Sequence, residues 1–390
     1  MNKTQCLDHY FSSYDKNVSG KYGKTTGSDI IQTCEQHYPV DTIMFPDETH
    51  LWNILRIYFY LSHSFQPQQQ KLSLWNIQQH YPLPFLFRYL VKKQINNSLP
   101  PIKNKDVLDE IIRTASEQST IPIEQIKKEI HQYLLMFHCS LQYHHPRMKK
   151  NKEPLMISCA YGRYNMGKVQ AAKKQGRTII EQQHGIITSQ HMGYIKSSSS
   201  LCQDATPHEL HVWGPYFKEL VHTSSLFEHI TITQHPHIQL RPHMPHTGKP
   251  VVLLTSQWLF SQQLLRFAEQ LATILPTWQI WLKPHPLDTM IHTSNKIHIC
   301  SPKENVYQLL QKTDVHLTVF STVGLECFAY GIPSVLFDIN KYHTPRVSEG
   351  FAIINSVEQA AEIIPILYEK HQQQEAYRIG QYCFNGGKNK

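Results

Sequence analysis

The stretch VHLTVFSTVGLECFAYGIP, residues 315–333, contains the signals of one strand–helix unit. It opens with a mainly apolar run of the length of a buried strand, and it then places Ser321 and Thr322, two good N-cap residues, where a helix would begin. The Gly-Ile-Pro at its end stops the helix, and the apolar run at 334–337 reads as the next strand. Together these features predict half of a doubly wound α/β domain.

The start of that helix is a candidate phosphate site. Backbone N–H groups of a first helical turn carry partial positive charge and attract phosphate in the crevice at the strand ends. Ser321 and Thr322 add hydroxyl groups, and Glu326, one turn further on, could accept hydrogen bonds from ribose hydroxyls. The alternative is an ordinary βαβ unit in which the Ser-Thr pair only caps the helix.

Strand and helix patterns alternate on both sides of a candidate linker, TQHPHIQLRPHMPHTGKP at 233–250. Residues 154–232 and 247–375 each read as a Rossmann-like α/β domain with parallel strands. Residues 1–150 read as largely helical, with helices expected at 51–65, 85–91, 106–117 and 123–137 and a basic loop at 145–154. We therefore expect two α/β domains that face one crevice. The N-terminal domain, 1–240, would include the helical part, and the C-terminal domain would span 247–375.

The charge of the chain limits the classes of partner. The 390 residues carry a net charge of +8 with histidine neutral, which suits an anionic substrate or the face of an anionic membrane. No basic run is interleaved with aromatic residues, so the sequence does not indicate nucleic-acid binding.

Eight cysteines never form a CxxC pair, and several lie within apolar runs. This pattern favours reduced, buried thiols in a cytosolic protein over a disulfide framework or a zinc site. The N-terminus lacks the apolar core of a signal peptide, and no apolar run reaches the roughly 18 residues of a membrane span. We expect a cytoplasmic protein that is peripheral at the inner membrane at most.

Two further short motifs stand at the ends of predicted strands, where α/β folds bind ligands. The first is EQQHG at 181–185, followed by HMGY at 191–194, and the second is KPHP at 283–286. Taken singly, a His-Gly or His-Pro pair is more often a loop histidine that the backbone satisfies than a functional group. In this order, and together with the Ser-Thr pair above, the motifs are far more specific.

These motifs, with HVWGPYF at 211–217 and FSTVGLECFAYGIPSV at 320–335, resemble those of bacterial GT-B glycosyltransferases that assemble surface polysaccharides. The similarity is strongest to Kdo transferases and related capsule enzymes, whose pattern is E-x-Q-H-G…H-x-G-Y, then K-x-H-P, then S-T…E. The His-Pro and Ser-plus-Glu parts are also similar to motifs of bacterial sialyltransferases and polysialyltransferases. The resemblance covers residues 155–345 and implies the GT-B fold, with two Rossmann-like domains around a central cleft. Residues 1–150 would be the variable acceptor side.

The resemblance implies a nucleotide-sugar donor, here a CMP-activated 2-keto acid sugar such as Kdo or a sialic acid, held mainly by the C-terminal domain. His285 would donate to the leaving phosphate, Ser321 and Thr322 would bind its oxygens, and Glu326 would hold the ribose. Lys283 could add positive charge or form a structural ion pair. Since these groups can stabilise the leaving charge, neither a metal nor another cofactor is expected.

The same resemblance places the acceptor side at the first motif. His184 is a candidate catalytic residue there, and either it or the backbone of Gly185 could meet the carboxylate of the donor sugar. Gly185, His191 and Tyr194 would belong to the substrate-binding set. The acceptor would be a lipopolysaccharide or capsule glycan, or a glycolipid.

Glu181 is the candidate catalytic carboxylate, because it is the acidic residue of the first motif and stands at the end of a predicted strand. It could act as a general base toward the acceptor hydroxyl or as a nucleophile in a double displacement. Asp204 and Glu209 are further candidates, so retention and inversion both stay open. The structural alternative is an inward carboxylate fixed by a nearby arginine.

Three other functions fit parts of the same pattern. A glycerophosphotransferase of the teichoic-acid type and a UDP-sugar transferase or epimerase would grip phosphate with a similar histidine and Ser/Thr pair. A non-catalytic polysaccharide-assembly protein could keep the fold and lose the chemistry.

Overall fold

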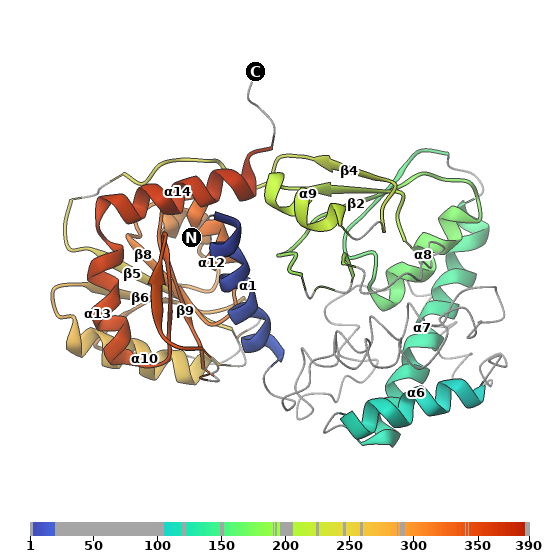
Figure 1. Ribbon diagram of the computed structural model, residues 1–390, viewed down its shortest axis with the longest axis horizontal. Coiled ribbons are helices and arrows are strands. Elements are labelled where there is room, and N and C mark those ends of the chain that lie inside the picture. The colour runs from blue at the N-terminus through green and yellow to red at the C-terminus, as the bar shows by residue number, and fades with distance from the viewer. Residues whose placement is uncertain are drawn as a thin grey trace. The chain divides into compact units, whose positions relative to one another are not determined.

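The computed structural model divides the chain into two compact units (Figure 1). Unit 1 is Met1–Asn17, Trp213–Glu219 and Ile232–Lys390, and unit 2 is Val18–Val212 and Leu220–Thr231. The helices expected at 51–65 and 85–91 lie outside the described residues. The structure describes residues 3–19, 105–118, 122–148, 152–189, 191, 193–195, 206–223, 226–244, 247–257, 260–286, 288, 293–339, 341 and 343–386.

Unit 1 contains a seven-stranded sheet in the order β10-β11-β9-β8-β5-β6-β7. Every neighbouring pair is parallel except β10–β11, which is antiparallel. The predicted strand at the start of the 315–333 stretch is β8, in the middle of this sheet. The strands are β5 (Val251–Thr255), β6 (Gln279–Lys283), β7 (His298–Ile299), β8 (Val315–Thr318), β9 (Ser334–Phe337), β10 (Arg346–Ser348) and β11 (Phe351–Ile354).

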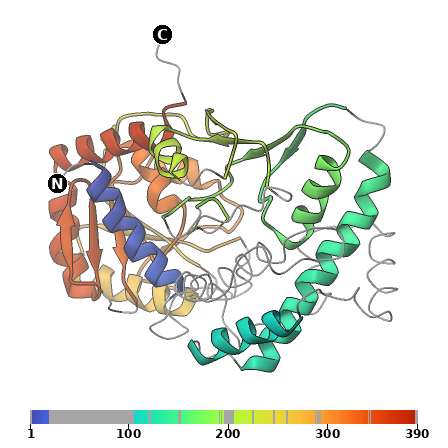
Figure 2. The ribbon, with the colours of Figure 1, turned by 45° about the vertical axis from the view of Figure 1, so that its right-hand side comes forward.

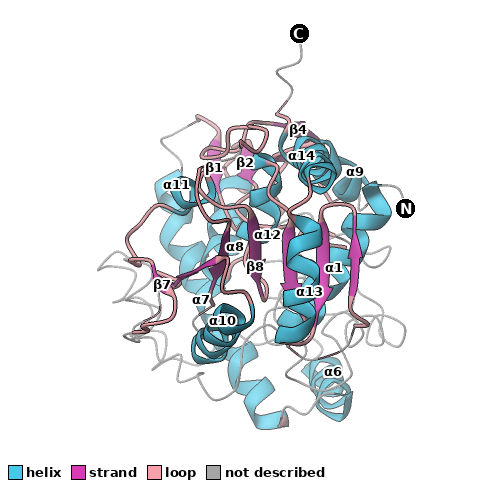
Figure 3. Ribbon diagram, turned by 90° about the vertical axis from the view of Figure 1, so that its left-hand side faces the viewer, coloured by secondary structure: helices cyan, strands magenta, loops and turns pink. Residues whose placement is uncertain are grey.

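Helices cover both faces of this sheet, as in a doubly wound fold. On one face, α10 (Ser261–Ile274) and α13 (Val357–Leu367) share a core with Ala352 and Ile354 of β11. Figure 3 shows α13 lying over the strands. On the other face lie α1 (Lys3–Ser19), α12 (Val323–Glu326) with the 3₁₀ turn η3 (Cys327–Tyr330), and α14 (Lys370–Phe384). These layers confirm the α/β class.

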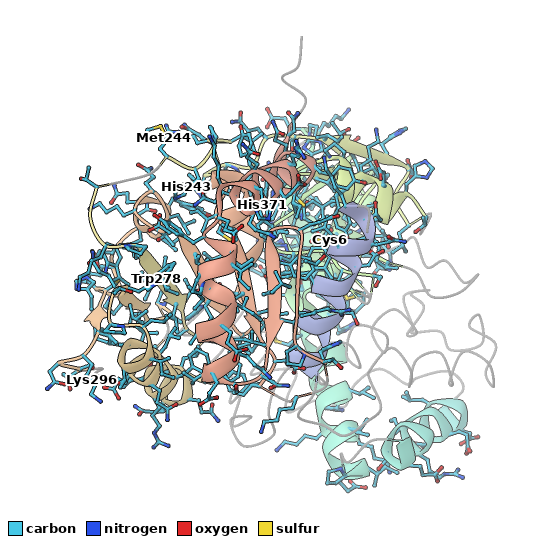
Figure 4. The ribbon with its side chains drawn as sticks, turned by 60° about the vertical axis from the view of Figure 1, so that its left-hand side comes forward. Cys6, His243, Met244, Trp278, Lys296 and His371 are labelled. Atoms are coloured by element: carbon cyan, nitrogen blue, oxygen red, sulfur yellow. The ribbon has the colours of Figure 1, made fainter. Side chains whose placement is uncertain are left out.

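The N-terminal helix α1 belongs to unit 1, whereas the sequence assigned residues 1–240 to one N-terminal domain. Tyr10 and Phe11 are buried. The Tyr10 ring packs edge-on against Phe328 and Phe351, with ring centroids 6.2 and 5.7 Å apart. Cys6, labelled on α1 in Figure 4, is also buried. This docking joins residues more than 300 positions apart, and no local pattern encodes such a contact.

The segment expected to be a linker packs on unit 1. The N–H of Arg241 donates to the Ala329 carbonyl at 2.9 Å, and His243, labelled in Figure 4, pairs with Asp314 at 3.2 Å. The His235 ring packs edge-on against the Trp213 ring, with ring centroids 4.4 Å apart. The proline-rich composition of this segment predicted an interdomain linker. In the structure, His235 and His243 instead contact residues of unit 1 that lie far away in the sequence.

The C-terminal domain also extends past its predicted end. The sequence ended this domain at residue 375, but α13 ends at Leu367 and is followed by a second helix, α14, which begins at Lys370 and runs to Phe384. Trp278, labelled in Figure 4, packs edge-on against Tyr368 between these helices, with ring centroids 5.3 Å apart. The break therefore lies where an aromatic contact anchors the turn.

Unit 2 carries a four-stranded sheet in the order β1-β2-β3-β4, with β1–β2 and β2–β3 parallel. The strands are β1 (Leu155–Ile157), β2 (Ile179–Gln182), β3 (Glu209–Val212) and β4 (His229–Ile232). The helix α8 (Arg163–Lys173) connects β1 to β2, so these three elements form the predicted βαβ unit.

The long helix α7 (Ile123–Met148) packs along α8, as Figure 2 shows, and α6 (Lys105–Gln118) precedes it. The two helices approach closely at Gly167, where an added Cβ would lie 2.4 Å from the Phe137 carbonyl oxygen. The prediction of a loop from residue 145 was wrong for its first four residues, because α7 continues through Pro146 to Met148.

The helix α9 (Pro215–His222) follows β3, and α11 (Val306–Leu310) precedes β8. Across the described part of the chain, every helix is too short or too polar to span a membrane.

Candidate functional site

Glu181 lies at the carboxyl end of β2, where it pairs with Ile157 of β1 and Leu210 of β3. Its side chain is only 1% exposed. The carboxyl atom Oε1 accepts hydrogen bonds from the backbone N–H of Ala160 at 3.0 Å and from the hydroxyl group of Tyr194 at 2.9 Å. The carboxyl group of the first motif is therefore fixed inside unit 2 by a backbone amide and a tyrosine.

Burial raises the pKa of Glu181 to about 7, from an ordinary value of 4.5. The hydrogen bonds from the N–H groups of Ala160 and Cys159 and from Tyr194 oppose this rise, but they are the smaller effect. Cys159 has a φ of +55°, a left-handed conformation, so the chain turns sharply after β1 and brings these amides to the carboxyl group. A carboxyl group with a pKa near 7 can accept and release a proton at neutral pH.

A chain of hydrogen bonds leads from Glu181 to the surface. The Tyr194 hydroxyl group lies 3.1 Å from Nδ1 of His184, and the Tyr161 hydroxyl group lies 3.3 Å from Nε2 of the same ring. Tyr161 also lies 3.2 Å from Nε2 of His191, whose Nδ1 accepts the Gly193 N–H at 3.2 Å. His191 is buried and His184 is exposed, so His184 is where this chain meets solvent.

Desolvation lowers the pKa of both histidines, that of His191 to about 3. Both imidazole rings are therefore neutral at pH 7. Each neutral ring carries one N–H donor and one acceptor nitrogen, which is what a continuous hydrogen-bond chain needs.

Tyr161 is the residue of this cluster that the motif search missed. Its ring covers Gly193, where an added Cβ would lie 2.5 Å from the ring atom Cδ1. The glycine of HMGY is thus explained by the close approach of an aromatic ring. A signal was present, because Tyr161 follows a predicted strand parallel to the EQQHG strand, and the carboxyl ends of parallel neighbours share one sheet edge.

Side chains alternate along β2, and Ile179 and Glu181 are buried on one face. Glu209 pairs with Ile180, so its side chain lies on the opposite face of the sheet. There it accepts a hydrogen bond from Thr231 at 2.6 Å, which is the main cause of its lowered pKa. Glu209 therefore does not share the Glu181 cluster.

Gly185, the last residue of the EQQHG motif, has a structural contact through its backbone. The carbonyl oxygen of Gly185 accepts a hydrogen bond from the Gln183 side chain at 2.9 Å, which shapes the loop after β2. Asp204, the other acidic candidate, lies outside the described residues.

The second motif, KPHP, lies in unit 1 at the carboxyl end of β6. Lys283 is buried, and its ammonium group donates to the carbonyl oxygens of Pro284 at 3.1 Å and Pro302 at 2.9 Å. It thus ties the His-Pro loop to the chain after β7. The backbone N–H of His285 donates to the Ser256 hydroxyl group at 3.2 Å. The His285 side chain is half-buried, and desolvation is the main cause of its lowered pKa.

The Ser-Thr pair follows β8, which is a direct neighbour of β5 in the sheet. The Ser321 hydroxyl group accepts the N–H of Val323, the first residue of the short helix α12, at 3.3 Å. Glu326 is buried, with its pKa raised by burial, and it bonds to the side chains of Thr322 and Tyr307. The carboxyl group proposed to hold ribose is therefore engaged inside unit 1.

A cavity of about 530 Å³ opens in unit 1 beside Tyr307. Its lining includes Arg241, the ring of Tyr330 and the side-chain amides of Gln239 and Gln308. Since Tyr307 also bonds to Glu326, the cavity adjoins the third motif. Aromatic rings, amides and a guanidinium group are the lining expected for a polar ligand such as a nucleoside or a sugar.

The structure thus gathers the predicted residues into two sets. Glu181, His184, His191 and Tyr194 form one cluster in unit 2, while the second and third motifs follow β6 and β8, the two strands that flank β5 in unit 1. Within the described ranges, no group of three or more His, Cys, Asp or Glu side chains has the geometry of a metal site.

No family model matches the chain, and no curated protein matches it either. Among solved structures, the chain is similar to the calicheamicin glycosyltransferase, at 12% identity over 67% of this chain and 77% of that one, with a TM-score of 0.45. It is also similar to UDP-GlcNAc 2-epimerase from Neisseria meningitidis bound to UDP-GlcNAc (12% identity, 64% and 80% coverage, TM-score 0.44). A third is the wall teichoic acid polymerase TagF (14% identity, 68% and 95% coverage, TM-score 0.42). At these scores we assign no function from the likeness.

Proposed function

We propose that the protein is a glycosyltransferase that moves a sugar from a nucleotide donor to a hydroxyl group of a glycan or glycolipid acceptor. The observation that carries this proposal is the buried carboxyl group of Glu181, which is linked through Tyr194 to the exposed His184. Glycosyl transfer to an alcohol needs a base, because the acceptor hydroxyl group loses its proton as it attacks. A carboxyl group with a raised pKa behind a neutral imidazole suits that task.

Unit 1 supplies groups suited to the donor phosphates. The ring of the half-buried His285 offers one N–H donor when neutral, and its backbone is held by Ser256 at the end of β5. The hydroxyl group of Ser321 lies after the adjacent β8, where it accepts the Val323 N–H at the start of α12. In α/β folds, strand ends of this kind bind anions, and preorganised donors there stabilise the charge that develops on a leaving phosphate.

The donor we propose is a CMP-activated 2-keto acid sugar, on the strength of the sequence motifs alone. Because His285, Ser321 and Thr322 could carry the leaving-group charge, transfer is expected to continue in the presence of EDTA.

The first experiment is a thermal-shift panel with CMP, UDP, GDP and dTDP. A nucleotide at a hundred times its dissociation constant adds about 2.7 kcal/mol to the free energy of unfolding, which raises Tm by a few degrees. The largest shift with CMP would support the proposed donor, and the largest shift with UDP would support the UDP-sugar alternative instead. No shift with any of the four would contradict nucleotide-sugar transfer.

The second experiment removes the donor-side histidine. His285→Ala should lower kcat for sugar transfer about 10²–10³-fold, because an imidazole N–H no longer meets the leaving phosphate. The matched control is His298→Ala, which removes an exposed histidine from β7 in the same unit. Equal rates for the two variants would contradict the role of His285, provided both melt like the wild type.

A further inference from the structure

Glu181 is the natural choice for the base, but its side chain is closed off from an acceptor. It is only 1% exposed, and its Oε1 already accepts two hydrogen bonds, from Ala160 and Tyr194. Proton transfer requires the base to lie within hydrogen-bond reach of the acceptor hydroxyl group. The exposed member of the cluster is His184.

The hydrogen bonds of the cluster all fit one direction. The Gly193 N–H donates to Nδ1 of His191, so the hydrogen of that neutral ring is on Nε2, which can donate to the Tyr161 oxygen. Tyr161 then donates to Nε2 of His184, and the Nδ1–H of His184 donates to the Tyr194 oxygen. The Tyr194 hydroxyl group donates to Glu181.

We propose that His184, Tyr194 and Glu181 form a proton relay, in which His184 takes the proton of the acceptor and Glu181 ends up holding it. The relay rests on the proposed glycosyl transfer, and it assigns Tyr194 a part in the chemistry, beyond substrate binding.

The acceptor O–H bond breaks, its oxygen forms a bond to the anomeric carbon, and the bond from that carbon to the leaving oxygen breaks with its electron pair. The acceptor proton moves to Nε2 of His184 while Nδ1 passes its proton to the Tyr194 oxygen. Tyr194 in turn passes its own proton to Oε1 of Glu181. The imidazole and the phenol both end neutral, with the tautomer of His184 reversed.

The surroundings of Glu181 favour this use. The groups that face it are the thiol of Cys159, the hydroxyl group of Tyr194 and, beyond them, the rings of Tyr161, His184 and His191. Burial raises the pKa of the Cys159 thiol and of Tyr194 and lowers that of both histidines, so these groups are neutral at pH 7. Burial also raises the pKa of the Glu181 carboxyl group to about 7. A proton that arrives at Glu181 at pH 7 is therefore bound and released about equally readily, and it can return after the product leaves.

Tyr161 marks where the acceptor would enter. Its hydroxyl group lies 3.3 Å from Nε2 of His184, the longest contact of the cluster, and an acceptor hydroxyl group could take its place. The rings of Tyr161 and Tyr194 also pack edge-on against each other, with their centroids 5.4 Å apart. Tyr161 is a positioning residue in this account.

The deciding variant is Tyr194→Phe, which removes one oxygen and keeps the ring. We expect kcat for transfer to fall at least about 10²-fold, with the KM for the donor and the Tm gain from nucleotide unchanged, since the donor groups lie in unit 1. The matched control is Tyr164→Phe. Tyr164 also bonds to a histidine in unit 2, at 2.6 Å from Nε2 of His144, but outside the cluster. It should keep kcat within a few-fold of the wild type.

The pH profile separates a relay from simple packing. In the wild type, kcat should rise with pH through about 7, as Glu181 ionises. In Tyr194→Phe, the residual activity should follow His184 alone, and the rising limb should move to lower pH, because desolvation lowers the pKa of that ring. A Tyr194→Phe enzyme with the wild-type kcat and the wild-type limb would overturn the relay.

A measurement that does not depend on activity tests the relay even where a variant folds poorly or the donor is not the proposed one. Nitrogen NMR of the histidine rings, with His184 assigned by its loss in His184→Gln, should show the hydrogen on Nδ1 in the resting protein. A hydrogen on Nε2 would break the chain of donors and overturn the proposal. If the wild type transfers no sugar from any nucleotide donor, the proposed function fails, whereas this tautomer still tests the hydrogen-bond chain.

Discussion

Replacing Glu181 by Gln should change how stability depends on pH, and the structure gives the size of the effect. The amide keeps an oxygen where Oε1 accepts from Ala160 and Tyr194, so the fold of unit 2 should persist. What the variant loses is a carboxyl group whose pKa burial raises from 4.5 to about 7.

The sign follows from proton linkage. Between pH 4.5 and about 7, the folded protein holds a proton on Glu181 that the unfolded chain has released. The free energy of unfolding of the wild type therefore falls as pH rises through this window and is constant above it. At about 1.4 kcal/mol per pH unit, this contribution is about 3 kcal/mol in all, of which about 2–3 kcal/mol falls between pH 5 and pH 8.

Hydrogen exchange measures this locally, because peptides that span β1 and β2 report the opening free energy of unit 2. The difference between Glu181→Gln and the wild type at the same pH cancels intrinsic exchange rates and the titration of all histidines. We expect Glu181→Gln to gain about 2–3 kcal/mol relative to the wild type from pH 5 to pH 8. Glu117→Gln, which removes an exposed carboxylate of α6, is the control and should show no such gain. A pH-independent difference for Glu181→Gln would refute the reasoning.

Two further substitutions test the architecture of the two sites. Lys283→Met should lower the free energy of unfolding by about 1–3 kcal/mol, because the carbonyl oxygens of Pro284 and Pro302 lose their buried donor; urea unfolding against the exposed control Lys303→Met measures this, and equal midpoints would contradict it. Gly193→Ala should place a Cβ 2.5 Å from the Tyr161 ring and lower the free energy of unfolding by about 1–3 kcal/mol. An unchanged melting curve for Gly193→Ala would show that the ring can move aside.

For the functional residues, the sequence predicted some features and the tertiary structure decided others. Period-2 alternation puts Glu181 on the same face of β2 as Ile179, and the structure shows both side chains buried. The sequence could not tell that its partners are the Ala160 N–H and the Tyr194 hydroxyl group instead of an arginine, because these residues lie 21 positions upstream and 13 positions downstream. The sequence left open whether Lys283 adds charge at the phosphate site or has a structural role. In the structure its ammonium group donates to the carbonyl oxygen of Pro302, in the loop after β7, which the sequence around Lys283 could not indicate.

Local signals by themselves determined the strands, the helix stops and the order of the motifs. Apolar runs, N-cap residues and Gly-Pro stops act over a few residues, so β5, β6, β8 and β9 could be read directly from the chain. Only the tertiary structure decided that α1 docks on the C-terminal unit, that residues 233–250 pack on that unit, and that α14 follows α13 as a separate helix. Those outcomes depend on contacts such as Tyr10 with Phe351, whose burial stabilises the fold only after the chain has brought distant surfaces together.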